Sequence, residues 1–148
     1  MIWKELNDNL IFHNLKVSDN IEVLQLMGDA MIQEGYGEEG FTEAVLKREK
    51  DYPTGLDVNV IGVAIPHTDA EHVKKEGISI AVLNPPIEFD AMGEEDCRIP
   101  VKIVIMFTVA GKDKHIDRLL QVLDMIKDEE ILQGLLDAKN KKEIRTVI

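Results

Sequence analysis

The chain has 148 residues, of which 45% are hydrophobic and 30% are charged, a composition that suits one globular domain and excludes a mainly disordered chain. Its 17 basic and 28 acidic residues give a net charge of −11, which disfavours nucleic acid and anionic lipid as partners and favours a basic protein surface. The one cysteine, Cys97, allows no internal disulfide. We expect a single cytoplasmic domain over residues 1–148, because neither a secretory signal nor a membrane span is visible.

The first third of the sequence predicts a strand followed by two helices. Residues 10–12 form a short apolar run typical of an edge strand. Asp19 opens a capping box, so we expect a helix to begin directly after it and to end at Gly35. A second helix is predicted over residues 42–50, and Pro53 limits it because the residue before a proline disfavours helical backbone angles.

The middle third changes character and predicts three strands, each bordered by proline. These strands cover residues 60–65, 78–83 and 101–109. Their β-branched, apolar composition shows little alternation, which is typical of strands at the centre of a sheet that is covered on both faces.

The last third predicts helices. A run of apolar residues at helical spacing predicts one helix from about residue 113, and two short helices are expected over residues 129–136 and 141–148. We expect the buried stripe of the first helix to contain Ile116, Leu119, Leu120, Leu123 and Ile126. Helices, then strands, then helices indicate an α/β sandwich, in which a mixed sheet has helices on both faces.

The most informative segment is residues 62–69, where a buried strand leads into Pro66 and His67. Ligand sites in open α/β sheets lie beyond the carboxyl ends of strands. Pro66 has a fixed φ and no N–H, so it holds the next residue stiffly at that edge. Imidazole titrates near neutrality and serves as nucleophile, base or ligand, which makes His67 the candidate reactive group. The alternative is a histidine that only forms a hydrogen bond within a turn.

Three further residues are candidates for the same site. Arg48 at the end of the second helix, followed by Thr54 and a glycine, would make a corner that holds an anion. His115 lies at the start of the helix after the longest strand, where it would face His67 across adjacent strand ends. Taken alone, Arg48 is better explained as a solvated charge at a helix end, which the helix dipole favours. The alternative for His115 is a capping or surface histidine.

Other chemistries find less support. The histidines of residues 67–72 are five positions apart, so neither a helix nor a strand places both on one face, and we expect no metal site. No nucleotide-binding glycine loop is present. Acidic neighbours of Cys97 would raise the pKa of its thiol, which argues against a nucleophilic cysteine.

Residues 45–49, 52–56, 63–69 and 72–73, together with residues 119–123 near the end of the chain, resemble a known family. The chain is similar to the EIIA component of the bacterial phosphoenolpyruvate-dependent sugar phosphotransferase system, of the mannitol/fructose type, and resembles its galactitol-specific branch most. The resemblance extends from about residue 6 to the end of the sequence. It implies the family fold, a mixed and mainly parallel sheet flanked by helices.

The resemblance also implies a function. His67 would accept a phosphoryl group from the phosphocarrier protein HPr and pass it to a cysteine of EIIB, which serves the membrane component EIIC. Arg48 and His115 match family residues that stabilise the phosphoryl group, and Thr54 matches one that could add a hydrogen bond. It implies no cofactor and no metal. We expect an accessible His67 within a shallow apolar patch that has an acidic rim.

Several points stay open at the level of the sequence. Family members often have glycine or alanine after the histidine, where this chain has Thr68 and Asp69, and this difference favours the galactitol branch. The Nδ1–H of His67 would donate to a backbone carbonyl or to Asp69. The alternatives to a sugar phosphocarrier are a regulatory EIIA-like module and a metal-dependent hydrolase that uses His67, Asp69 and His72.

Overall fold

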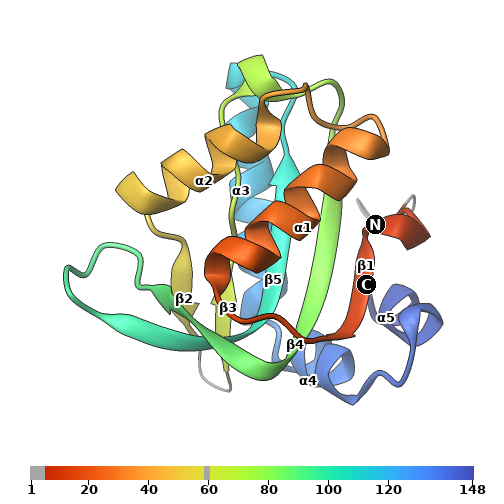
Figure 1. Cartoon of the computed structure of the whole chain (residues 1–148). Helices are drawn as coiled ribbons and strands as arrows, with labels where there is room; N and C mark the ends of the chain where they lie inside the picture. The colour runs from red at the N-terminus through yellow and green to blue at the C-terminus, as the bar shows by residue number, and fades with distance from the viewer. Residues whose placement is uncertain (1–5, 59–60) are drawn as a thin grey trace.

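The computed structural model describes residues 6–58 and 61–148, apart from the side chains of residues 112–115. Five strands form one sheet in the order β1-β4-β5-β3-β2, with β1 at one edge as the sequence predicted (Figure 1). The strands are β1 (Ile11–Leu15), β2 (Gly55–Asp57), β3 (Gly62–Ala64), β4 (Gly77–Asp90) and β5 (Arg98–Thr108). The short β2 was not predicted, since three residues after a turn carry too little pattern to detect.

The sheet is mixed, but it is not mainly parallel as the family resemblance implied. β1 pairs with β4 and β3 pairs with β5 in parallel, whereas β2 with β3 and β4 with β5 are antiparallel. β4 and β5 are consecutive strands joined by a short loop, and such a connection only permits antiparallel pairing. Because β3 and β5 are parallel, their carboxyl ends lie at the same end of the sheet.

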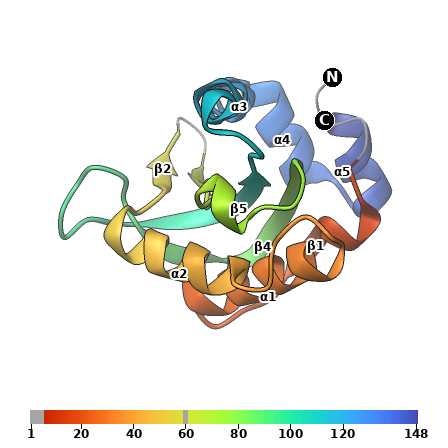
Figure 2. The ribbon, with the colours of Figure 1, turned by 90° about the horizontal axis from the view of Figure 1, so that it is seen from above.

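Helices cover both faces of the sheet, which confirms the predicted sandwich. Figure 2 shows α1 (Asn20–Gln33) and α2 (Phe41–Asp51) on one face, and α3 (Lys112–Lys127) and α4 (Glu129–Asp137) on the other. Each face buries its own apolar cluster, and alternate residues of β4 and β5 belong to opposite clusters. Burial on both faces explains why these strands are apolar without alternation.

The ends of α1 follow their sequence signals. The side chain of Asp19 accepts a hydrogen bond from the backbone N–H of Glu22 at 2.9 Å, which caps the first turn. Beyond the helix, Gly35 has a φ of 86°, a conformation that glycine adopts without steric cost. One face of α1 is apolar and packs on the sheet. Its buried residues are Val23, Leu24, Met27 and Met31.

Two predicted details were wrong. The strand expected to end at residue 83 continues to Asp90, because a register irregularity between Val82 and Ile87 accommodates the prolines. In α3 the predicted stripe is wrong at Ile116 and Leu120, which are exposed. It is right at Ile126, which is buried, and at Leu119 and Leu123, which pack against the core, and Val122 and Met125 are buried in addition. The exposed pair lies one helical turn apart, so α3 presents apolar side chains to solvent as well as to the core.

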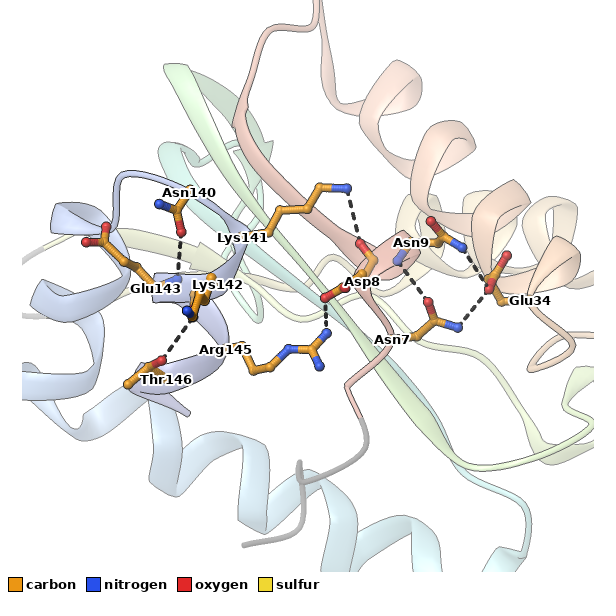
Figure 3. A network of polar contacts seen from close by, with 10 residues as sticks. All are labelled: Asn7, Asp8, Asn9, Glu34, Asn140, Lys141, Lys142, Glu143, Arg145 and Thr146. Carbon is orange, nitrogen blue, oxygen red and sulfur yellow. Dashed lines mark hydrogen bonds and ion pairs between the residues drawn. The ribbon is translucent and has the colours of Figure 1, made fainter.

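The C-terminal helix α5 (Lys141–Val147) is attached to the N-terminal part of the chain (Figure 3). Arg145 forms an ion pair with Asp8 in the short 3₁₀ helix η1 (Asp8–Leu10), and Lys141 Nζ donates to the carbonyl of Asp8 at 3.2 Å. These contacts hold α5 beside the β1 edge. Within residues 6–58 and 61–148, no helix has the length and apolar character needed to cross a membrane.

Candidate functional site

The candidate site lies where the parallel strands β3 and β5 end. The chain leaves β3 at Ala64 and continues along β5, where the backbone N–H of Phe107 donates to the carbonyl of Pro66 at 3.3 Å. His67 therefore emerges at the carboxyl edge of the sheet, where the sequence predicted the site.

Two contacts fix the imidazole of His67. Its Nδ1 lies 2.9 Å from the carbonyl oxygen of Ile65, and its ring stacks on Phe107 with centroids 4.7 Å apart and planes at 24°. A carbonyl only accepts hydrogen bonds, so Nδ1 carries the proton and the neutral ring has its lone pair on Nε2. Of the two acceptors considered from the sequence, the structure selects the backbone carbonyl over Asp69.

His67 is less accessible than the sequence analysis expected. Only 6% of the residue is exposed. The stack on Phe107 explains much of this burial, because it covers one face of the ring. A partner therefore has to reach the ring through a small opening, or the side chains around it have to shift.

Arg48 joins the end of α2 to the loop that follows His67. Its Nη1 lies 3.3 Å from Asp69 Oδ1, and its Cζ lies 5.5 Å from the ring centroid of Tyr52. Its Nε is buried and, among the described residues, has no hydrogen-bond partner. Asp69 follows His67 by two residues, so the Arg48 guanidinium lies beside the loop that carries the histidine. A planar guanidinium in that place is suited to bind an anion.

Thr54 is close to the site but is engaged differently from the prediction. The residue is 3% exposed, its Oγ1–H donates to Glu49 Oε1 at 2.6 Å, and its N–H donates to Glu49 Oε2 at 2.7 Å. The hydroxyl proton is thus directed at a carboxylate. A hydrogen bond from this hydroxyl to a phosphoryl group would require that contact to break.

Glu49 is a residue that the sequence analysis missed. Burial raises the pKa of its carboxyl to about 7, although the two hydrogen bonds from Thr54 favour the charged form. A signal was present: Glu49 shares a helix face with Phe41 and Val45, both of which are buried. A carboxylate on the apolar side of an amphipathic helix indicates a buried polar contact.

Three further residues named from the sequence are His115, His72 and Cys97. His115 belongs to α3, but its side chain is among those outside the described residues, so its supporting role stays a prediction. Among the described side chains, no group of three or more histidine, cysteine or acidic residues could hold a metal ion. The Nε2 atom of His72 lies 3.4 Å from Oε1 of Glu71, the residue before it in sequence. The Cys97 thiol has a raised pKa, with a hydrogen bond to Glu94 as the main cause.

The edge of a mixed sheet between two helix layers thus holds a histidine with a fixed ring and an arginine beside its loop, an arrangement chemically suited to an anionic group. Comparison with known proteins identifies the family. Residues 4–148 match the model for the phosphoenolpyruvate-dependent sugar phosphotransferase system, EIIA 2. The chain belongs to this family, whose members transfer phosphoryl groups.

Three relatives illustrate the similarity. The galactitol-specific EIIA component of Escherichia coli strain K12 is 25% identical over 118 residues, which is 80% of this chain and 78% of the relative. The mannitol-specific enzyme IIA component of Staphylococcus aureus strain Mu50 is 31% identical over 143 residues, 95% and 92% of the two chains. A solved complex of mannitol enzyme IIA with phosphorylated enzyme IIB from Escherichia coli matches with a TM-score of 0.78, 25% identity and coverage of 97% and 96%.

Proposed function

We propose that this chain is a phosphocarrier that accepts a phosphoryl group from HPr on Nε2 of His67 and passes it to a cysteine of an EIIB partner. The observation that carries the proposal is the bond between His67 Nδ1 and the Ile65 carbonyl, because it leaves the lone pair of the neutral ring on Nε2. In the first transfer the phosphorus–nitrogen bond of phospho-HPr breaks as a bond to Nε2 forms. In the second transfer the bond between phosphorus and Nε2 of His67 breaks as a bond between phosphorus and the cysteine sulfur of EIIB forms.

The charge of the transferred group has to be balanced locally. A phosphoryl group brings about two negative charges at neutral pH, and the chain already has a net charge of −11. Arg48 supports the proposal, since its guanidinium is beside the loop that carries His67 and its Nε has no partner within the described residues. His115 is proposed as a second stabilising residue from the family resemblance alone.

The proposed partners follow from the relatives and from one surface feature. The related mannitol enzyme IIA was solved with phosphorylated enzyme IIB, which supports an EIIB partner here, and EIIB would serve a membrane EIIC. Ile116 and Leu120 are exposed on α3, which begins four residues after β5 ends at the edge that carries His67. Exposed apolar side chains beside a site are typical of a protein-docking surface.

We propose a sugar alcohol as the transported substrate, with galactitol as the first candidate. Relatives named for galactitol and for mannitol support the class, because both are sugar alcohols. The sugar itself would bind EIIC and not this chain. Phospho-transfer to galactitol-specific and mannitol-specific EIIB proteins, measured side by side, distinguishes the two candidates.

Intact-protein mass spectrometry after incubation with phosphoenolpyruvate, Enzyme I and HPr tests the proposal. The wild type is expected to gain one phosphoryl group that is labile in acid and stable in alkali. His67→Ala should gain none, while His72→Ala, a control at a histidine outside the site, should match the wild type. An unmodified wild-type protein, or an adduct that persists in His67→Ala, would contradict the proposal.

A further inference from the structure

A buried carboxylate lies below the candidate site and is not used by the phosphoryl transfer. Glu49 is 6% exposed and accepts hydrogen bonds from both donors of Thr54, at 2.6 Å from the hydroxyl and 2.7 Å from the backbone N–H. Fully buried glutamates are rare unless they are paired. The charge that acts on this carboxylate is Asp90 at the end of β4, which is paired with Arg98 of β5.

Hydrogen bonds continue from Thr54 to the nucleophile. The carbonyl of Thr54 accepts the N–H of Ile65 at 3.3 Å, and the carbonyl of Ile65 lies 2.9 Å from Nδ1 of His67. Each contact holds one peptide group of a residue, and the peptide group on the other side of the same residue makes the next contact. The antiparallel pair of β2 and β3, with Gly55 opposite Ala64, runs alongside this series.

We propose that Glu49 is a positioning residue for His67: its carboxylate holds the backbone of Thr54, which orients the Ile65 carbonyl that keeps the proton of His67 on Nδ1. The inference rests on the proposed role of His67 as the phosphoryl acceptor. Glu49 does not touch the transferred group in this scheme. It acts through three consecutive contacts, all of which are buried or at the strand end.

The reach of the side chain and its charge have different consequences, and two substitutions separate them. Glu49→Gln keeps the length and one acceptor oxygen but removes the charge. Glu49→Asp keeps the charge but retracts the carboxylate by about one carbon–carbon bond, roughly 1.5 Å. A positioning role predicts near-normal behaviour for Gln and a defect for Asp, whereas a purely electrostatic role predicts the reverse.

Two measurements read the outcome. The nitrogen-15 NMR shifts of His67 report the tautomer directly: the wild type and Glu49→Gln should hold the proton on Nδ1, and Glu49→Asp should show a mixture of tautomers. The rate of phosphoryl transfer from phospho-HPr should fall about tenfold or more in Glu49→Asp, because misplacing a reacting group by about 1 Å is that costly. It should stay within about threefold in Glu49→Gln. Glu43→Asp, at an exposed position of α2, is the matched control and should resemble the wild type.

Thr54 provides a second series in case Glu49→Asp does not fold. Thr54→Ser keeps both hydrogen bonds to Glu49 and should leave the His67 tautomer and the transfer rate unchanged, whereas Thr54→Val removes one bond and should lower the rate about fivefold. A wild-type tautomer in folded Glu49→Asp would overturn the inference, as would a wild-type transfer rate in Thr54→Val. The NMR result does not depend on transfer, so it decides about Glu49 even if the wild type accepts no phosphoryl group.

Discussion

At the scale of single residues, the site is defined by what the backbone does to one histidine. The fixed φ of Pro66 and its carbonyl contact with Phe107 continue the line of β3 beyond its last paired residue. His67 then turns back to the carbonyl of Ile65, so the acceptor for Nδ1–H comes from the chain itself. A backbone carbonyl does not titrate, so the acceptor for Nδ1–H does not itself change with pH.

Asp69 is therefore not expected to control the tautomer of His67. Asp69→Ala removes the exposed ion pair with Arg48, and exposed pairs contribute about 1 kcal/mol or less. We expect the rate of phosphoryl acceptance to change by less than about fivefold and the tautomer to remain on Nδ1. Quenched-flow transfer from phospho-HPr measures the rate. A loss of more than about a hundredfold would mean that Asp69 takes part in the chemistry.

Arg48 should matter more than its ion-pair partner. Charge-assisted hydrogen bonds are worth about 1.5–3 kcal/mol each, so Arg48→Ala should slow phosphoryl acceptance by roughly tenfold to a hundredfold. Arg48→Lys keeps the charge but loses the planar donor set, and we expect it to recover only part of the rate. Quenched-flow rates for both variants give the comparison. Wild-type transfer by Arg48→Ala would remove this residue from the site.

At the scale of secondary-structure elements, the contact between the end of α2 and the start of β2 should make stability depend on pH. Burial raises the pKa of Glu49 to about 7 in the folded chain, and the nearby Asp90 adds to the effect. Between the ordinary carboxyl pKa and about 7, the folded protein holds a proton that the unfolded chain has released. Stability therefore falls as pH rises through this window, by up to about 3 kcal/mol for this group.

Denaturant unfolding at pH 5 and pH 8 tests that dependence. Glu49→Gln has no proton to lose at this position, so its free energy of unfolding should increase relative to wild type as the pH rises. Glu43→Gln, at an exposed position of the same helix, controls for the loss of a negative charge. A difference between Glu49→Gln and wild type that is the same at both pH values would show that Glu49 is not protonated at pH 5 in the folded protein.

The elements also show what the sequence could predict and what it could not. The cap at Asp19, the limit at Gly35 and the apolar central strands are encoded in neighbouring residues, and the structure confirms them. The continuation of β4 beyond its prolines depends on pairing with β5, a contact between distant segments. The bond between Glu49 and Thr54 was missed for a related reason, since a glutamate beside an arginine at a helix end usually faces solvent.

At the scale of the whole molecule, two helical layers leave one edge of the sheet available for the site. α1 and α2 cover one face and α3 and α4 the other, while α5 is held against the β1 side by Asp8 (Figures 2 and 3). The site lies instead at the carboxyl ends of β3 and β5. Because α2 and α3 come from opposite layers, Arg48 and the exposed face of α3 belong to different sides of the same edge.

The net charge of −11 should raise the rate at which this chain associates with a basic partner. Opposite charges accelerate association, and salt removes the effect as the screening length falls from about 30 Å at 0.01 M to about 3 Å at 1 M. We therefore expect the second-order rate of transfer from phospho-HPr to fall as ionic strength rises.

The exposed acids Glu94 and Glu95 line a pocket with Tyr52, next to Arg48. Replacing both with glutamine should lower the rate at low salt and flatten its salt dependence, whereas Glu130→Gln on α4, in the opposite layer, should do neither. A transfer rate that is insensitive to salt in the wild type would mean that apolar contacts alone, such as those available at Ile116 and Leu120, bring the two proteins together.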